Sequence, residues 1–265
     1  MIFNSKCLPK SRSNIKMKIS VICCWNNLDI LNRDLVPSIN RQNHSGAIEK
    51  IYFDNTECCY NNAADALNHC ADIATGDIFI FIHQDVELLG DNFFEKLLIH
   101  IDQLSNMGAA GIVGAIGPDR RKRIRGRCIQ GLNIDNTFMP IESIEKVQTL
   151  DELLLITSKV VFQKIKFDPI TCNSWDLYGV DYCLRCSEHG YVNYVLPLAV
   201  RHASWGRLGP SYYKTLKNLI KRHSSIKIIY TTCGVWFTKF SIHVNFIIHK
   251  SNSFYEKVLL RMGIK

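Results

Sequence analysis

The chain has 265 residues, a mass of 30.4 kDa and a formal net charge of +8, from 32 Lys and Arg against 24 Asp and Glu. Hydrophobic residues make up 47% and charged residues 21%, which is ordinary globular usage and excludes collagen-like and low-complexity chains. No apolar run reaches about 18 residues, so we expect no transmembrane helix. The basic balance favours anionic partners such as nucleotides, phospholipid headgroups or nucleic acid.

The 11 cysteines are an odd number scattered through apolar runs, a pattern that indicates small buried side chains rather than a disulfide framework. We therefore expect a reducing, cytoplasmic compartment. Cys183 and Cys186 have a C-x-x-C spacing. Because no second pair stands at zinc-ribbon distance, zinc or redox chemistry is the weaker interpretation of these two residues.

The first half of the chain alternates strand and helix patterns. Residues 1–17 form a basic lead-in with no signal-peptide core. The apolar patterns after it predict strands over 18–25, 47–53, 77–82 and 109–116, and helices over 31–39, 61–74 and 93–104. This alternation predicts an α/β fold with a mostly parallel central sheet and helices on both faces.

The second half is less regular. A basic loop over 118–127 precedes strands over 148–157, 159–162 and 192–198, and helices over 176–189, 212–222 and 253–262. We expect one main domain over 18–209 and a basic, aromatic, helical extension over 210–265. The described patterns contain no internal repeat.

Polar residues follow several of the predicted strands. In an open parallel sheet, ligands bind beyond the carboxyl ends of the strands. The polar positions there are Asn26, Asn27, Asp54, Asn55, His83, Asp85 and His202. We expect them to converge on one crevice, where Asp85 and His83 would suit a divalent cation such as Mn²⁺. The alternatives are a helix cap or solvated turn for Asp85 and a structural histidine at 202.

Asp181 lies at the start of the helix predicted over 176–189. A half-buried carboxylate there is a candidate general base. A charge that favours the helix N-terminus is the structural alternative, and the sequence leaves both open.

The order of these pieces resembles a GT-A glycosyltransferase of the family 2 type. More narrowly, it resembles a bacterial branch that includes capsule-biosynthesis and streptomycin-biosynthesis-type proteins. The residues that carry the likeness, over about 18–209, are Phe81-Ile82-His83-Gln84-Asp85-Val86, Thr149-Leu150-Asp151-Glu152, Phe167-Asp168, Leu177-Tyr178-Gly179-Val180-Asp181-Tyr182-Cys183-Leu184-Arg185, Gly190-Tyr191 and Val200-Arg201-His202.

The resemblance implies a Rossmann-like nucleotide-diphospho-sugar transferase fold and an inverting, hexosyltransferase-type reaction. Asp181 would be the catalytic base. Asp85, with His83 and His202, would hold Mn²⁺ or Mg²⁺ against the donor diphosphate. The donor nucleotide would contact Asn26, Asn27, Asp54, Asn55 and Gln84, and the acceptor side would hold Trp175, Tyr178 and Trp205.

The implied partners are a nucleotide-sugar donor, with a UDP-sugar favoured, and a glycan, lipid-linked or other hydroxyl acceptor. Cations such as Arg201 and Arg207 would add to the neutralisation of the diphosphate. Two positions depart from the family pattern: His83 replaces the first Asp of the Asp-x-Asp motif, and Val180 replaces the Glu of a Glu-Asp pair. They keep open a non-catalytic domain that binds a nucleotide or a glycan.

The basic loop over 118–127 and the tail over 210–265 each have more than one interpretation. The loop is either a solvated surface segment or a contact for phosphate groups and anionic lipid. The tail packs on the main domain, forms a dimer contact or lies at a membrane interface. Few aromatic residues interleave with the charges of the loop, so we expect no nucleic-acid partner.

Overall fold

The computed structural model describes residues 17–43, 46, 48–105, 110–121, 123–131, 140–205 and 208–250. The helix predicted over 253–262, Arg207 and nearly all of the basic lead-in lie outside these ranges. Within the described part of the chain, no helix is long and apolar enough to cross a bilayer.

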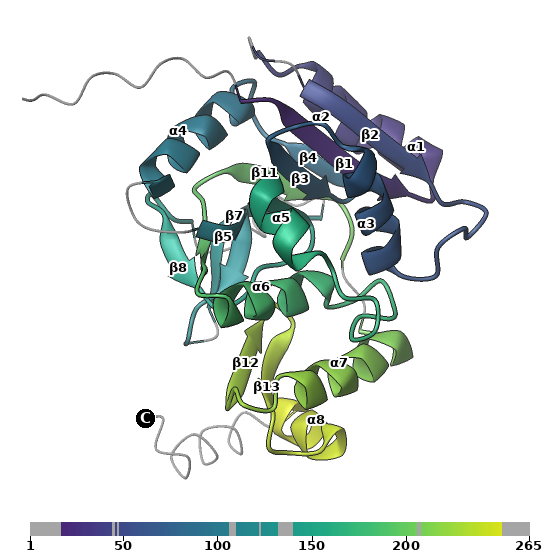
Figure 1. Ribbon diagram of the computed structural model, residues 1–265, viewed down its shortest axis with the longest axis vertical. Coiled ribbons are helices and arrows are strands. Elements are labelled where there is room, and N and C mark those ends of the chain that lie inside the picture. The colour runs from purple at the N-terminus through teal and green to yellow at the C-terminus, as the bar shows by residue number, and fades with distance from the viewer. Residues whose placement is uncertain are drawn as a thin grey trace, which may run out of the picture.

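A mixed seven-stranded sheet forms the centre of the molecule (Figure 1). Its strands, from edge to edge, are β2 Ile48–Asp54, β1 Ile19–Trp25, β3 Ile78–Ile82, β9 Leu154–Ser158, β5 Ala110–Gly114, β10 Val192–Val195 and β8 Glu145–Val147. The pairs β2–β1, β1–β3 and β5–β10 are parallel, whereas β9 runs antiparallel to both of its neighbours. The edge strand β8 is antiparallel to β10. The predicted α/β class is confirmed, but the sheet is mixed and not mostly parallel, because β9 and β8 run against their neighbours.

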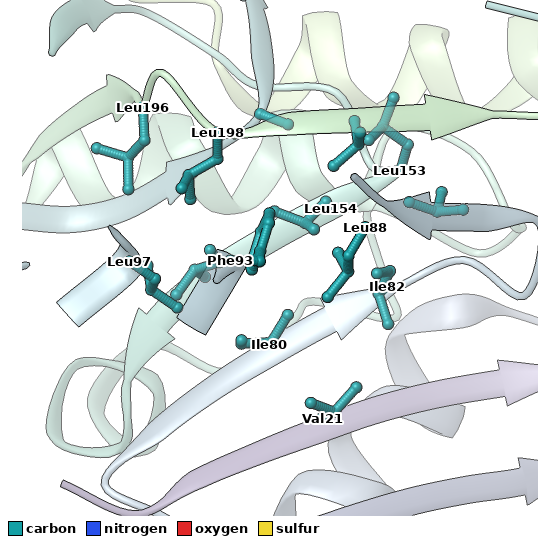
Figure 2. Packing of buried hydrophobic residues seen from close by; sticks show 14 of the residues in the cluster. Val21, Ile80, Ile82, Leu88, Phe93, Leu97, Leu153, Leu154, Leu196 and Leu198 are labelled. Atoms are coloured by element: carbon teal, nitrogen blue, oxygen red, sulfur yellow. The ribbon is translucent and has the colours of Figure 1, made fainter. Parts of the chain in front are cut away.

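Helices cover both faces of this sheet, as expected. They are α1 Leu28–Ile30, a π-helical turn Leu31–Leu35, α2 Val36–Asn40, α3 Ala63–Ile73, α4 Phe93–Ser105, α5 Lys159–Ile165 and α6 Tyr178–Glu188. Successive strand residues point to opposite faces. Val21 and Ile80 pack with Phe93 of α4 on one face (Figure 2), while Phe79 and Phe81 pack with α3, α5 and α6 on the other.

A second sheet holds four strands: β4 Val86–Leu88, β11 Ala199–His202, β7 Ile124–Gln130 and β6 Ile116–Pro118. The segment predicted as a basic loop over 118–127 is therefore largely the β6–β7 hairpin. Two of its arginines are paired, Arg123 with Asp119 at 2.7 Å and Arg125 with Glu145 at 2.6 Å. The positive charges of these two arginines are therefore balanced by neighbouring carboxylates.

The prediction of a strand over 159–162 is wrong, because these residues begin helix α5. Ser158 Oγ accepts a hydrogen bond from the Val161 amide at 3.3 Å, which caps the helix. The β-branched pair Val160-Val161 favours a strand locally. The cap and the burial of Val161 and Phe162 against Phe79 and Phe81 outweigh that preference.

The C-terminal elements are α7 Pro210–Arg222, β12 Ile228–Thr231, β13 Gly234–Phe237 and α8 Ile242–Lys250. They lie together at one end of the molecule, below α6 in Figure 1. Leu216 and Leu219 of α7 share a buried cluster with Val180 and Leu184 of α6. Helix α6 therefore faces the central sheet on one side and the C-terminal elements on the other.

Candidate active site

The carboxyl ends of β1, β2 and β3 meet at one edge of the central sheet. Trp25 lies opposite Asp54 in the parallel register, and the Asn55 amide donates to the Trp25 carbonyl at 2.8 Å. Asn26 follows β1, and His83 follows β3 directly. The segments that follow these three strands therefore lie side by side, as one shared crevice requires.

Gln84 fixes the loop after β1. Its Oε1 accepts from the amides of Asn26 and Asn27, both at 3.0 Å, and its Nε2 donates to Asn26 Oδ1 at 2.8 Å. These three bonds join the end of β3 to the end of β1. Gln84 therefore shapes the cleft as well as lining it.

A cleft of about 550 Å³ opens at this edge. The predicted residues that line it are Asn26, Asn55, His83, Gln84, Asp85, Trp175 and Tyr178, together with Trp25, Thr56, Tyr60 and Asn61 from the same loops. Amides, hydroxyls and aromatic rings at the carboxyl edge of parallel strands are typical of a nucleotide site.

Three predicted donor residues have structural partners. Asp54 is exposed and does not line the cleft; its Oδ1 accepts from the Thr56 amide at 2.8 Å. Asn27 caps α1 by accepting from the Ile30 amide at 3.1 Å. Asn55 is buried, and its side chain bonds the backbone of Tyr60 twice. These three side chains hold the loops around the cleft. The contact of Asp54 with the base of the donor nucleotide stays a prediction.

His83, Asp85 and His202 form a compact cluster, with one ligand atom of each lying within 4.8 Å of the others. His202 Nε2 is 3.4 Å from Asp85 Oδ1, and the two imidazole rings have centroids 5.9 Å apart. His202 reaches the cluster because β11 pairs antiparallel with β4, which follows Asp85. Two ligand atoms bound to one small divalent ion at about 2.1 Å are separated by roughly 3 Å, so the 3.4 Å between His202 and Asp85 suits a metal, and small side-chain shifts would bring in His83.

Two of the three groups in the cluster have the charge state of a metal ligand. Burial and the neighbouring His202 lower the pKa of His83, which favours the neutral imidazole. Burial alone would raise the pKa of Asp85, but the hydrogen bond and charge of His202 lower it well below its usual range. Burial alone would lower the pKa of His202, whereas the hydrogen bond and charge of Asp85 raise it, so this imidazole must release a proton when a metal binds.

His83 Nε2 also meets the Tyr178 hydroxyl at 3.1 Å, and His202 Nδ1 meets the Gln130 amide at 3.2 Å. The Tyr178 hydroxyl is an outer partner of the kind that fixes the ring of a metal-binding histidine. Gln130 Nε2 is a donor that also bonds the Ser204 carbonyl, so His202 Nδ1 accepts at this contact.

A second cavity of about 270 Å³ adjoins the first, and both include His83 and Trp175. Its other polar and aromatic residues are Gln130, Asp151, Glu152, Asp176, His202, Trp205, Tyr212, Thr232 and Cys233. Trp175 is 43% exposed and Trp205 62% exposed, so their rings are accessible. The predicted acceptor-side pair Trp175 and Trp205 thus meets in this cavity, while Tyr178 lines the first.

Sequence reasoning assigned no role to Asp151 and Glu152. They precede β9, and because β9 runs antiparallel to β3, its start lies beside the end of β3, with Leu154 opposite Ile82. Burial and the charge of Asp151 raise the pKa of Glu152 to about 8. Its Oε1 has a weak contact from the Val180 amide at 3.4 Å, whereas Asp151 is bonded by Thr232 Oγ1 and the Leu153 amide. In the sequence, the feature that could have identified them is a pair of acidic residues directly before an apolar strand pattern.

Asp181 is fully buried and lines neither cavity. Its Oδ2 accepts from Arg185 Nε at 2.6 Å, and its Oδ1 lies 2.8 Å from His223 Nε2. Both oxygens are committed to interior partners, so the prediction of Asp181 as the base that meets an acceptor does not fit this geometry. The structural alternative is the better interpretation of this residue.

Two further expectations change. Arg201 pairs with Glu87 at 2.6 Å and lies 3.7 Å from Asp34, so it is not directed to a diphosphate. Val180 is buried among Leu184 and Leu216, so the departure at position 180 lies outside both cavities.

The cysteines of the described residues are free thiols. Cys183 and Cys186 are both buried, and burial raises the pKa of Cys186 to about 12. An un-ionised, buried thiol is a packing group, which agrees with the weaker weight given to zinc or redox chemistry.

Comparison with known proteins bears on this site. A crystal structure of GalNAc-T7 with UDP, GalNAc and Mn²⁺ superimposes with a TM-score of 0.56 at 11% identity, over 78% of this chain and 48% of that one. The chain thus spans about half the length of that solved protein, and the likeness shows the GT-A fold. No curated protein matches the chain. The profile of a family described as a glycosyltransferase-like family matches residues 20–207, which is most of the chain. The protein therefore belongs to this glycosyltransferase-like family.

Proposed function

We propose that this protein transfers a sugar from a nucleotide diphosphate donor to a hydroxyl acceptor. The observation that carries the proposal is the position of the His83–Asp85–His202 cluster, where two adjoining cavities share His83. In an inverting displacement, the acceptor hydroxyl attacks the anomeric carbon on the side opposite to the leaving diphosphate. Two cavities that meet at one charged cluster suit that requirement.

The larger cavity is the proposed donor site. Asn55, Thr56 and Asn61 supply amide and hydroxyl groups, and Trp25 and Tyr60 supply aromatic surface for a base. A UDP-sugar is the first donor to test, since the GalNAc-T7 structure was solved with UDP and Mn²⁺. The sugar would extend towards His83 and Trp175, which line both cavities.

The cluster fits a divalent ion by its donor set. Asp85, His83 and His202 would hold it, and two imidazole nitrogens favour Mn²⁺ over Mg²⁺. When bound, such an ion supplies Lewis-acid neutralisation of the charge on the leaving diphosphate. Gln130 and Tyr178 keep the two rings in position through the nitrogens that they contact.

Glu152 is the proposed acceptor base in place of Asp181. It lines the smaller cavity, and its pKa, raised to about 8 by burial and Asp151, is close to that of an efficient base at neutral pH. Its carboxylate would take the proton of the acceptor hydroxyl as that oxygen attacks the anomeric carbon and the bond to the diphosphate breaks. One displacement of this kind inverts the anomeric centre. Trp175 and Trp205 would bind the acceptor against their exposed rings.

The finer parts of the proposal are a hexosyl donor, an acceptor that is a glycan or a lipid-linked hydroxyl, and a cytoplasmic location. The free thiols of the described cysteines support the reducing compartment. The capsule and streptomycin-biosynthesis branch remains the proposed relationship within the family.

The direct test is release of nucleoside diphosphate from UDP-, GDP- and dTDP-sugars with Mn²⁺, with and without simple sugar acceptors. We expect one donor to be hydrolysed slowly alone and faster with an acceptor. The alternative, a non-catalytic nucleotide- or glycan-binding domain, is favoured by His83 in the metal motif. Tight donor binding without turnover would support that alternative. No binding of any donor would contradict both the transfer reaction and a nucleotide-binding domain, and would leave glycan binding.

A further inference from the structure

The C-terminal elements carry only positive formal charges. Residues 189–255 include no Asp or Glu, and within them the described segment 208–250 holds seven cations: Lys214, Lys217, Lys221, Arg222, Lys227, Lys239 and Lys250. With seven of the chain's 32 Lys and Arg and none of its 24 Asp and Glu, this segment accounts for nearly all of the net charge of +8. The positive charge of the protein is thus concentrated at one end of the molecule.

Helix α7 displays three of these lysines on one face. Lys214, Lys217 and Lys221 follow an i, i+3, i+7 spacing, which aligns them along the helix. All three are exposed, and none forms an ion pair with the described residues. The opposite face, with Tyr212, Leu216 and Leu219, is buried. Arg222 differs, because it pairs with Glu188 at 3.0 Å. We call the three lysines the lysine stripe.

Helix α8, which contacts α7, exposes apolar side chains. Ile247 is 59% exposed, and Val244, one turn earlier, is 37% exposed. The ring of Phe246 packs edge-on against Tyr213 of α7, with centroids 5.7 Å apart. Tyr213 lies four residues before Lys217 and therefore on the adjacent part of the helix surface. The contact between Phe246 and Tyr213 thus places α8, with its exposed Val244 and Ile247, next to the helix that carries the lysine stripe.

We propose that α7 and α8 form a docking surface for an anionic phospholipid bilayer. Lysines near a membrane surface are attracted to anionic headgroups, and exposed aliphatic side chains enter the boundary of the acyl region. Nucleic acid would satisfy the lysines, but it offers no apolar phase for Val244 and Ile247. The bilayer is the single partner that suits both sets of side chains.

Docking would place the lipid surface close to the smaller cavity. Tyr212 lines that cavity from the buried face of α7, while the lysine stripe lies on the outer face of the same helix. The thickness of one helix, about 10 Å, separates them. If the proposed function holds, a hydroxyl acceptor carried on a lipid would have a short path to the site. The docking itself does not depend on that function.

The test is co-sedimentation of the full chain with vesicles of phosphatidylcholine alone or with added phosphatidylglycerol. We expect binding to the anionic vesicles and weaker binding as salt is raised, because screening shortens the reach of the lysines. The pair Lys217→Gln and Lys221→Gln should lower the partition coefficient by about 25-fold, at about five-fold for each lysine. The matched control is Lys50→Gln with Lys96→Gln, which changes charge equally on β2 and α4 and should leave binding unchanged.

Ile247→Ser tests the apolar part. It should weaken vesicle binding at every salt concentration without changing the melting temperature, because the side chain is already exposed. Equal binding to neutral and anionic vesicles, or equal losses in the lysine pair and its control, would overturn the proposal. So would a dimer in solution that Ile247→Ser dissociates, since a second copy would then cover α8, or a preference of the lysine stripe for oligonucleotides over vesicles.

Discussion

Asp181 and His223 face each other with 2.8 Å between Oδ1 and Nε2, and both side chains are completely buried. The contact joins the first turn of α6 to the residue that follows α7. Glu188 reaches His223 Nδ1 at 3.0 Å, and Arg185 donates to Asp181 and to the carbonyls of Ile165 and Lys166. The acid at the start of α6 therefore holds the C-terminal elements onto the main domain.

The Asp181→Asn variant should be less stable than the parent and should keep its turnover. The amide cannot balance the charge of Arg185, which then stays buried without a carboxylate, so we expect a loss of about 3 kcal/mol in the free energy of unfolding. The measurement is chemical denaturation together with turnover at a temperature where the variant is folded. Near-normal kcat is expected.

Glu188→Gln is the control for this network. Glu188 is 33% exposed, so the loss should stay below about 1 kcal/mol. A stable Asp181→Asn variant with kcat lowered by orders of magnitude would restore Asp181 as the base and exclude the interpretation given above.

Glu152→Gln, in contrast to Asp181→Asn, should lower kcat. As the proposed base, Glu152 cannot be replaced by an amide without a loss in kcat of roughly 10²–10⁴-fold. Donor affinity should change little, because Glu152 lines the acceptor-side cavity and not the donor cleft.

The stability of Glu152→Gln should rise with pH relative to the parent. The folded pKa of about 8 exceeds the ordinary value of about 4.3, so the native state keeps a proton that the unfolded chain releases. The parent therefore loses stability as pH rises between these two values, and the variant does not. Denaturation at several pH values without metal measures the difference. Parallel curves for the two proteins would contradict the raised pKa, and unchanged turnover would remove Glu152 as the base.

Asp85→Asn should abolish the response to Mn²⁺. An ion that binds only the folded state raises the melting temperature in proportion to the logarithm of its concentration. We expect that rise in the parent and in Asp91→Asn, which changes an exposed carboxylate outside the cluster, but not in Asp85→Asn. A similar rise in all three proteins would place the ion elsewhere.

Much of the fold can be predicted from the sequence because its main elements have long patterns. The run Ile78–Ile82 and the apolar period of α3 identify a buried strand and a helix without further information. Strands β4, β8 and β11 have three or four residues each, too few to establish a period. The direction of β9 is also not encoded locally, since it follows from its pairing with Ile78–Ile82.

The candidate site also has a part that the sequence predicts and a part that it does not. The rule that ligands lie beyond the ends of parallel strands directs attention to Asn26, His83 and Asp85, which line the larger cavity. It misses Glu152, which precedes an antiparallel strand. Asp181 and Glu152 are both acids beside apolar runs, and what separates them is His223, 42 residues from Asp181 along the chain. Such a contact has no local signal.

Acid stability should depend on Glu49, a residue far from the cavities. Burial alone would raise its pKa, but hydrogen bonds from Ser20 Oγ at 2.6 Å and from the Thr75 hydroxyl and amide, together with Lys18, lower it to about 2. A carboxyl with a depressed folded pKa contributes stability above its ordinary pKa and loses it as pH falls towards the folded value. Because solvent screens a partly exposed carboxylate, the contribution should be about 1–2 kcal/mol at neutral pH, and it should disappear between about pH 5 and pH 2. Glu49→Gln should therefore be less stable than the parent at pH 7 and equal to it near pH 2.

The matched control is Glu57→Gln, which replaces an exposed acid in the loop after β2. Its denaturation curve should follow that of the parent at every pH. A constant difference between Glu49→Gln and the parent across this range would show that the effect is one of packing and not of charge.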